Sequence, residues 1–99
     1  MPNIKIEFHP SALEEAESAQ LWYAERSKAA SKAFVGELSH AINKISESPE
    51  RWPKFHKETR CYYFPRFPFS LIYRANKEQI EIIAVMHHRR KPGYWSERL

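Results

Sequence analysis

The sequence predicts a single α+β domain, in which a four-stranded, largely antiparallel sheet carries a helical hairpin on one face. Three features of the chain indicate this class. An N-terminal segment alternates apolar and polar residues, two long segments repeat apolar residues with helical spacing, and three further segments are rich in aromatic and β-branched residues. The predicted element order is therefore β-α-α-β-β-β. A length of 99 residues is typical of one domain, so residues 1–99 are assigned to one folding unit.

The first strand is predicted over residues 3–9, where every second side chain is apolar, and Pro10 ends it. Ser11 and Glu14 follow with the spacing of a capping box, which marks the start of a helix. This helix has one narrow face of mostly small residues, formed by Ala12, Ala16, Ala19 and Tyr23. Because small residues permit close approach, this face is expected to pack against the next helix.

The second helix is predicted from about Ser27 to Pro49. A longer apolar stripe recurs there at helical spacing, formed by Ala30, Phe34, Leu38, Ala41 and Ile45. The break near residues 26–28 joins the two helices into a hairpin. Gly36 lies inside the second helix, where glycine costs about 1 kcal/mol relative to alanine, and we interpret it as a notch for packing.

Three strands are predicted in the second half of the chain, over residues 55–64, 69–74 and 80–86. A short turn joins the last two. The last strand is expected at the centre of the sheet, because Ile83 and Val85 make it apolar on both faces. The first strand then pairs most economically with this central strand, which gives the strand order 1-4-3-2.

Composition excludes several classes of protein. The chain is 42% apolar and contains three Trp, five Tyr and six Phe, which is enough for a core and excludes intrinsic disorder. Cys61 is the only cysteine, so neither a disulfide within the chain nor a cysteine-based zinc site is expected, and a cytoplasmic location is predicted. No apolar segment approaches the ~18 residues that a membrane span requires, so no membrane association is expected.

The two halves of the chain differ in charge. Residues 1–50 carry five Lys and Arg against eight Glu, a net charge of −3, and residues 51–99 carry eleven against four, a net charge of +7, which sum to +4. A basic half favours an anionic partner, either nucleic acid or an acidic protein segment.

Short motifs are spread along nearly the whole chain. They are Phe8-His9-Pro10, Leu21-Trp22-Tyr23, Pro49, Arg66-Phe67-Pro68-Phe69, Leu71-Ile72-Tyr73-Arg74, the run from Ile80 to His87, and the C-terminal Arg90, Pro92 and Tyr94-Trp95. In this order and spacing they resemble the RelE/ParE family of toxins from bacterial type II toxin–antitoxin systems. The resemblance implies a growth inhibitor held inactive by a cognate antitoxin. An acidic antitoxin segment is expected on the basic sheet face or in a groove beside the helical hairpin.

The family contains two mechanisms on one fold, and the fold does not choose between them. RelE-like members cut mRNA on the ribosome without a metal ion, whereas ParE-like members poison DNA gyrase through protein contacts. The RelE-like pattern has cations on the second and third strands, where this chain has Cys61, Tyr63 and Ser70. DNA gyrase is therefore the favoured target, and the ribosome with its mRNA is the alternative. A third hypothesis is a degenerate, non-toxic module that only binds the antitoxin.

Metal-free RNA cleavage needs a proton acceptor, a proton donor and cations at the phosphate. The resemblance places Arg89 or Arg90, together with Tyr94, near the family's C-terminal Arg and Tyr. If the protein is an RNase, the catalytic candidates are therefore Arg90, Tyr94 and His88, the last of which could shuttle a proton. The candidates for contacting the target or nucleic acid are basic and aromatic residues of the C-terminal half: Arg60, Arg66, Arg74, His87, Arg89, Lys91 and Trp95.

Each candidate also has a structural interpretation. The arginines on the strands could pair with glutamates (Glu58, Glu78 or Glu81), and Trp95 could fold back onto the core. His87 and His88 follow the central strand directly, so they must point to opposite faces. The five histidines lack metal-ligand spacing with any carboxylate, so neither a metal nor another cofactor is expected. Residues 87–99 are expected to contribute little to the sheet and to concentrate the function.

Overall fold

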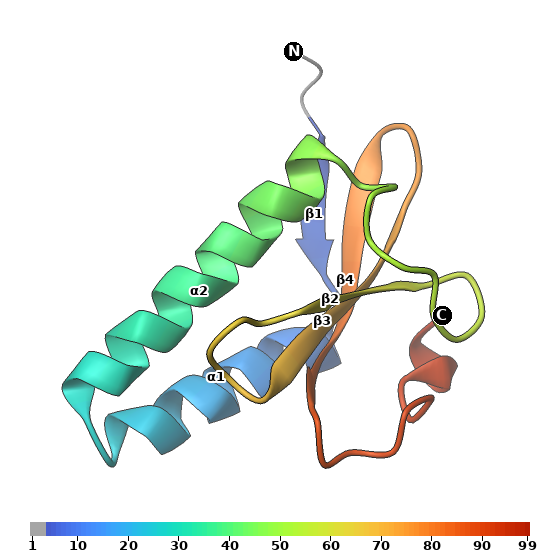
Figure 1. The fold of residues 1–99 in the computed structure, drawn as a ribbon. Coiled ribbons are helices and arrows are strands. Elements are labelled where there is room, and N and C mark those ends of the chain that lie inside the picture. Colours follow the sequence, from blue (N-terminus) through green and yellow to red (C-terminus); the bar gives the residue numbers. More distant parts are fainter. Residues whose placement is uncertain (1–3) are drawn as a thin grey trace.

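Two helices and one four-stranded sheet make up residues 4–99, the part of the chain that the computed structural model describes (Figure 1). Residue 3 of the predicted first strand lies outside this part. The elements are β1 (Lys5–Phe8), α1 (Pro10–Ala24), α2 (Lys28–Glu47), β2 (Arg60–Tyr63), β3 (Phe69–Ala75), β4 (Gln79–His87) and a short 3-10 helix (Ser96–Arg98). The sheet has the order β1-β4-β3-β2, with β1 parallel to β4 and the other pairs antiparallel. The predicted fold class and strand order are confirmed.

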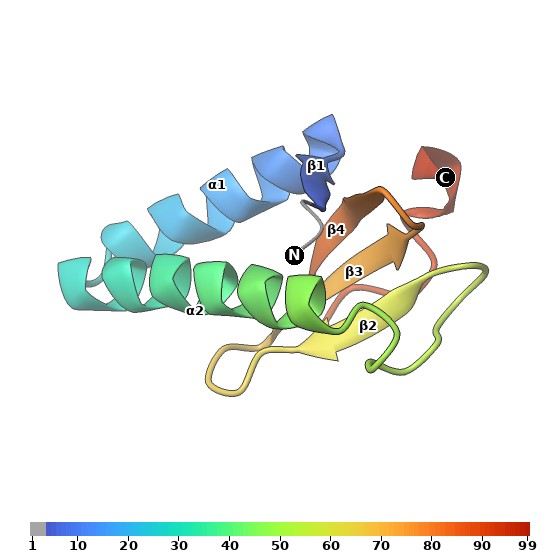
Figure 2. The ribbon, with the colours of Figure 1, turned by 90° about the horizontal axis from the view of Figure 1, so that it is seen from above.

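The helical hairpin lies on one side of the sheet and the C-terminal segment on the other (Figure 2). An apolar cluster of side chains lies against each face. The larger cluster lies between the helical hairpin and one face of the sheet, and includes Ala12, Ala16, Ala19, Phe34, Ala41, Ile45, Leu71, Tyr73, Ile80, Ile82 and Val85. The smaller cluster lies on the opposite face, and consists of Cys61, Ile72, Ile83, Ala84, Met86 and Trp95. Because β4 contributes to both clusters, its apolar pattern is continuous, as expected for a central strand.

The C-terminal segment covers part of the second face of the sheet. Trp95 is 0% exposed, and its ring stacks on Phe55 with the centroids 5.6 Å apart. The prediction that residues 87–99 contribute little to the sheet is therefore wrong. An aromatic residue near the end of the chain can supply the cover that a second layer of helices would otherwise give.

The first helix begins differently from the prediction. His9 is its N-cap, and the Nδ1 atom of His9 accepts a hydrogen bond from the Ser11 backbone N–H (3.1 Å). Pro10 occupies the first helical position, where a missing N–H loses no hydrogen bond. The predicted capping box is thus wrong, because Ser11 already lies inside the first turn. The second helix begins as predicted, since the Ser27 side chain accepts from the Ala30 N–H (3.2 Å).

The second strand is shorter than the predicted range 55–64. Lys57 has a φ of 59°, a left-handed conformation that interrupts an extended strand. The Thr59 hydroxyl donates to the His56 carbonyl (2.6 Å) and closes this turn. Regular pairing with β3 therefore starts only at Arg60.

The fourth strand, β4, extends beyond the end of β1, its parallel partner. The parallel ladder of β1 ends at Phe8, opposite Ile82. On the other side of β4, Tyr73 pairs with Ile82 and Ile72 pairs with Ala84, so Ile83 is the extra residue of a β-bulge. After this bulge, β4 has no strand on the side of α1 within the described chain.

Gly36 is not the packing notch that we predicted. It is exposed on α2, and a Cβ atom added there would meet nothing within 4 Å. Replacing Gly36 with alanine is therefore expected to stabilise the protein by roughly 0.5–1 kcal/mol, because alanine loses less backbone entropy in a helix. Chemical denaturation of the two proteins measures this difference. An unchanged or lower midpoint for Gly36→Ala would contradict the assignment of Gly36 to an open helix surface.

Candidate functional site

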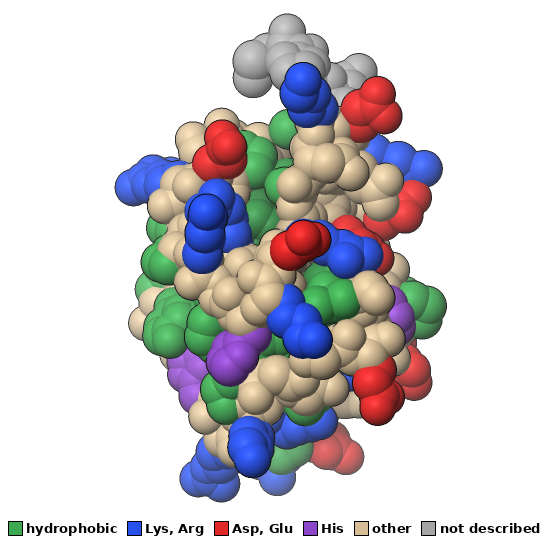
Figure 3. Space-filling view, turned by 90° about the vertical axis from the view of Figure 1, so that its right-hand side faces the viewer, with side chains coloured by type: hydrophobic (Ala, Val, Ile, Leu, Met, Phe, Trp, Pro, Cys, Tyr) green, Lys and Arg blue, Asp and Glu red, His purple; other side chains and the backbone are tan. Residues whose placement is uncertain are grey.

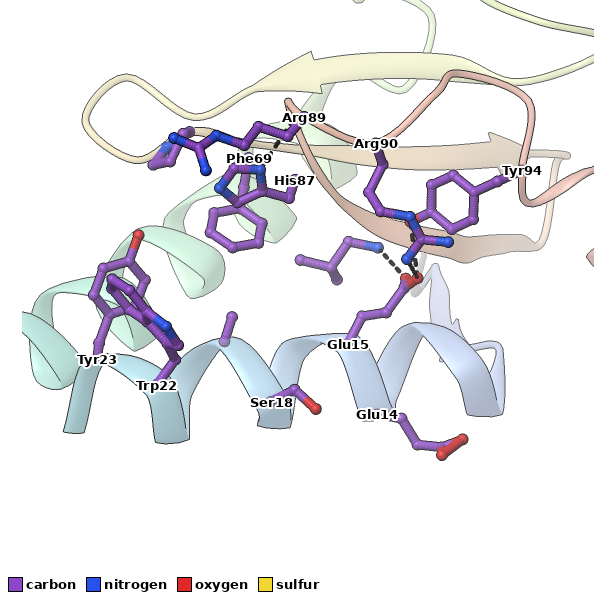
Figure 4. A pocket seen from close by; sticks show the side chains of 13 residues that line it. Glu14, Glu15, Ser18, Trp22, Tyr23, Phe69, His87, Arg89, Arg90 and Tyr94 are labelled. Atoms are coloured by element: carbon purple, nitrogen blue, oxygen red, sulfur yellow. Dashed lines mark hydrogen bonds and ion pairs between the residues drawn. The ribbon is translucent and has the colours of Figure 1, made fainter. Parts of the chain in front are cut away.

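An open groove runs along α1, between this helix and the end of β4 (Figure 4). Its volume is about 870 Å³. One wall consists of α1 residues: Glu14, Glu15, Ser18, Ala19, Trp22 and Tyr23. The other wall consists of the ends of β3 and β4 and the segment that follows: Pro68, Phe69, Val85, His87, Arg89, Arg90 and Tyr94. The groove thus brings together four predicted site residues, namely His87, Arg89, Arg90 and Tyr94.

The groove exists because β1 ends before β4 does, which leaves backbone groups of β4 without a strand partner. Two side chains occupy the place of the missing strand. The Val85 N–H donates to Glu15 Oε1 (2.9 Å), and the Ile83 carbonyl accepts from Arg98 Nη1 (3.0 Å). Buried backbone groups need hydrogen-bond partners. Glu15 and Arg98 provide for β4 the hydrogen bonds that the backbone of a neighbouring strand would otherwise make.

Glu15 joins three separate parts of the chain. Besides the Val85 N–H of β4, its carboxylate accepts from the Tyr94 hydroxyl (2.8 Å) and from both terminal nitrogens of Arg98 (3.0 and 2.9 Å). The side chains of Glu15 and Arg98 are each 16% exposed, and the hydrogen bond to Glu15 raises the pKa of Arg98. This two-point pairing fixes the C-terminal segment against α1 and β4.

Arg90 lies over the ring of Tyr94, beside the same carboxylate. Its guanidinium carbon is 3.7 Å from the ring centroid, and its Nη1 atom is 4.0 Å from Glu15 Oε2. Burial, followed by the hydrogen bond to Glu15, raises the pKa of Tyr94. The Tyr94 hydroxyl therefore stays protonated, and its hydrogen is already engaged in the hydrogen bond to Glu15. Arg90 is 53% exposed and keeps donors available toward the groove.

The two consecutive histidines lie on opposite faces, as predicted. His87 lines the groove, where its ring packs edge-on against Phe69 at 5.0 Å between centroids. Burial, and then the nearby charge of Arg89, lowers the pKa of His87. His88 lies on the other face, and its Nε2 atom is 2.9 Å from Ser70 Oγ. Only His87 can therefore act together with Arg90 and Tyr94.

The other predicted contact residues are dispersed. Arg60 donates to the carbonyls of Glu50 and Trp52 (3.1 and 2.8 Å), Arg66 pairs with Glu37 (2.9 Å), and Arg74 pairs with Glu81 (2.8 Å). Lys91 is exposed in the turn after β4. Trp95 is buried, as its structural interpretation expected, and presents no ring to a partner. The structure thus brings none of these five residues into the groove.

The surface around the C-terminal segment is mixed in charge (Figure 3). Lys and Arg side chains are spread over this face with acidic side chains among them, and several cations gather at its lower end. Within the groove, Arg89 and Arg90 are on one wall and Glu14 is on the other. A partner therefore meets cations mainly along the wall formed after β4.

Sequence reasoning missed Glu15 and Glu37. Both are acidic residues on the buried stripe of a helix: Glu15 lies three residues after Ala12, and Glu37 lies three residues after Phe34. The side chain of Glu37 is 5% exposed and accepts from the Arg66 backbone N–H (2.8 Å) as well as from its side chain. A carboxylate at a core position of a helix is the signal that could have identified both, because buried charges require partners.

Two absences within residues 4–99 bear on the kind of site. No three His, Cys, Asp or Glu side chains gather there in a way that could hold a metal ion. None of the described helices has the length and apolarity needed to cross a membrane.

Comparisons with known proteins bear on both the fold and the family. The family model described as "ParE toxin of type II toxin-antitoxin system, parDE" matches residues 6–92. Among solved structures, the fold is similar to "Chromosomal ParDE TA system from P. aeruginosa", with a TM-score of 0.72 and 16% sequence identity. This similarity covers 85% of this chain and 95% of that one. No curated protein sequence matches the chain significantly.

Proposed function

Because the chain belongs to the ParE family of toxins from type II toxin–antitoxin systems, we propose that it arrests bacterial growth by binding DNA gyrase. A cognate antitoxin is its partner within the system. The observation that carries the choice of gyrase over mRNA is that the candidate groups for RNA cleavage do not converge. Arg90 and Tyr94 line the groove, whereas His88 lies on the other face of the sheet.

The individual groups also fit protein contact better than proton transfer. The Tyr94 hydroxyl donates to Glu15, and its raised pKa makes it a poor proton acceptor at neutral pH. Cys61 and Ser70, which stand at the cleavage positions of the RelE-like pattern, are both buried. Of the three cleavage candidates, a substrate phosphate beside Arg90 would therefore meet only Tyr94, and the His87 imidazole that lines the same groove already accepts a hydrogen bond from the Arg89 backbone N–H through Nδ1 (3.0 Å).

The groove has the composition of a protein-binding surface. Trp22 is 51% exposed at one end, and Arg89 and Arg90 lie on the opposite wall. Tryptophan and arginine are enriched among residues that dominate binding energy, because each combines a large apolar area with directional polar groups. We infer that Arg89 and Arg90 contact the target directly.

The test combines purified gyrase with the toxin and with two double variants. The unmodified toxin is expected to inhibit supercoiling and to accumulate cleaved DNA. Arg89→Ala with Arg90→Ala is expected to remove this effect at an unchanged melting temperature, because both side chains are exposed. Lys28→Ala with Lys32→Ala removes the same charge from the exposed surface of α2 and is expected to retain it.

Three results would overturn the proposal. Unaffected gyrase together with mRNA cut at ribosomal A sites would establish the RelE-like alternative. Unaffected growth on expression of the chain alone would establish the non-toxic, antitoxin-binding module. Equal inhibition of gyrase by both double variants would show that Arg89 and Arg90 do not contact the target.

The antitoxin is expected to reach the cationic wall of the groove with an acidic segment. Raising the salt concentration from about 0.1 M to about 1 M should then weaken the complex by roughly tenfold or more, because exposed charges are screened within about 3 Å at the higher value. Titration calorimetry of the purified pair measures this change. An affinity that does not change with salt would contradict this electrostatic account. It would indicate that the antitoxin binds mainly through apolar contacts with Trp22 and its neighbours.

A further inference from the structure

His87 is the last residue of β4, and it bonds the backbone of the two arginines that line the groove after this strand. Its Nδ1 atom accepts a hydrogen bond from the Arg89 backbone N–H (3.0 Å), and its carbonyl accepts from the Arg90 backbone N–H (2.9 Å) (Figure 4). The ring packs edge-on against Phe69, which pairs with His87 in the β3–β4 ladder. His87 therefore fixes the turn through which the chain leaves the sheet.

The two arginines differ in how their side chains are held. Arg90 stacks on the Tyr94 ring and lies 4.0 Å from Glu15. Among residues 4–99, the guanidinium of Arg89 takes part in no ion pair and no cation–π contact. The direction in which Arg89 leaves the wall of the groove therefore depends on its backbone, which a side-chain atom of His87 holds.

This hydrogen bond requires one particular form of His87. A backbone N–H can only donate, so Nδ1 must carry a lone pair and the proton of the neutral imidazole must lie on Nε2. In the imidazolium both ring nitrogens carry hydrogen, and Nδ1 can no longer accept. The same arrangement occurs at the start of α1, where His9 Nδ1 accepts from the Ser11 N–H (3.1 Å). At two turns of this chain, a histidine thus holds the backbone N–H two residues further on.

The surroundings of His87 favour its neutral form. Burial, followed by the charges of Arg89 and His88, lowers the pKa of His87 below its ordinary value of about 6.5. β3 contributes only uncharged groups to the groove, Pro68 and Phe69. The other charged or titratable groups on the two walls are Arg90, Glu14, Glu15, Tyr23 and Tyr94. At neutral pH the imidazole is therefore neutral and able to accept.

We propose that His87 is a positioning residue, whose neutral imidazole fixes the backbone of Arg89 so that the guanidinium is presented to the target from the wall of the groove. The part that concerns the target rests on the proposed function, whereas the part that concerns Arg89 does not. A group that is held in place before binding loses less freedom when it binds. Loss of the hydrogen bond is therefore expected to weaken binding of the target.

The first test follows the free toxin by NMR spectroscopy from about pH 8 to about pH 5, the range in which histidine titrates. The imidazole nitrogen shifts should show an unprotonated Nδ1 at neutral pH, and the Arg89 amide signal should move as His87 titrates. In His87→Asn the Arg89 amide should not titrate, because an asparagine oxygen also accepts the N–H two residues on but carries no proton to gain. His40→Asn removes an exposed histidine from α2 and should leave the Arg89 titration unchanged.

The second test measures the affinity of the toxin for purified gyrase with two opposite substitutions. His87→Leu keeps apolar bulk against Phe69 but loses the acceptor, so it should weaken binding by about threefold to tenfold, the effect of one ordinary hydrogen bond. His87→Asn loses the ring but keeps the acceptor, so it should bind nearly as well as the unmodified toxin. In a chain that already carries Arg89→Ala, His87→Leu should have no further effect, because it acts through Arg89. Melting temperatures verify that each variant remains folded.

Three results would overturn this role of His87. An Arg89 amide that does not follow the His87 titration would show that the imidazole does not hold it. Weaker binding by His87→Asn but not by His87→Leu would show that the ring acts by packing on Phe69. Additive effects of His87→Leu and Arg89→Ala would show that His87 does not act through Arg89. If the unmodified toxin does not bind gyrase, the gyrase proposal fails, and the NMR titration alone decides whether His87 positions Arg89.

Discussion

Replacing Glu15 with alanine is expected to lower the free energy of unfolding by about 3 kcal/mol. The substitution leaves the Arg98 guanidinium, the Tyr94 hydroxyl and the Val85 N–H without their common acceptor. Because Arg98 is only 16% exposed, its charge is not fully hydrated after the carboxylate is lost. Removing one partner of such a pair costs more than the pair itself contributes.

Urea denaturation of Glu15→Ala beside two controls measures this effect. Glu14→Ala removes the neighbouring carboxylate, which is exposed, and is expected to change the free energy of unfolding by less than about 0.5 kcal/mol. Glu15→Gln keeps one acceptor oxygen, which can serve Val85 or Tyr94 but not both, and loses the charge, so its loss of stability should fall between the two. If Glu15→Ala were as stable as Glu14→Ala, the proposed role of Glu15 in joining α1, β4 and the C-terminal segment would be wrong.

Replacing Trp95 with alanine is expected to destabilise the protein by about 3–5 kcal/mol. Trp95 is the largest fully buried side chain, and its loss would leave a cavity against Ile72, Ile83 and Ala84. Trp95→Phe keeps an aromatic ring against Phe55 and should lose less than half as much. Trp22→Ala, which truncates a half-exposed tryptophan, should lose less still. Equilibrium denaturation followed by circular dichroism compares the three variants, and equal stabilities would show that Trp95 does not support the sheet.

These two predictions change how the C-terminal segment must be tested for function. The sequence predicts that residues 87–99 contribute little to the sheet, but the Tyr94 hydroxyl donates to Glu15 and the Tyr94 ring lies beside Trp95. Loss of toxicity in Tyr94→Ala could therefore arise from unfolding. Tyr94→Phe keeps the ring under Arg90 and removes only the hydroxyl. It separates the contribution of the Arg90 stack from that of the Glu15 hydrogen bond.

The sequence was sufficient to predict the order of elements and of strands. Helical spacing in α1 and α2 is set by residues that are in fact buried, such as Ala16 and Phe34, and the double apolar pattern of β4 reflects its two covered faces. The start of β2 was not predictable from pattern, because the turn at Lys57 depends on a left-handed conformation for which lysine gives no signal. Gly36 was misread because periodicity alone does not show which residues of α2 have a neighbour.

The candidate site was predicted only in part. The residues after β4 were identified from their charge and aromatic character, which local sequence reveals. The groove itself depends on how far β4 extends past β1, and on a register shift between β3 and β4. Both are properties of pairing between distant segments. Glu15 belongs to the site for the same reason, because its partners Val85 and Arg98 are 70 and 83 residues away in the chain.

The bulge at Ile83 also determines which of the residues that follow it face the groove and which face the other side of the sheet. In a regular strand neighbouring residues face opposite ways, whereas at this bulge Ile83 and Ala84 both belong to the cluster around Trp95, so the alternation after them is shifted by one residue. Regular alternation from Ile82 would place Ala84, Met86 and His88 on the side of α1; with the bulge, Val85 and His87 face α1 instead, and Met86 and His88 face the other side. The bulge therefore sets which histidine lies on which face. Deleting Ile83 would restore a regular ladder without exchanging the two faces, because Ala84 to His87 would keep their partners on β3.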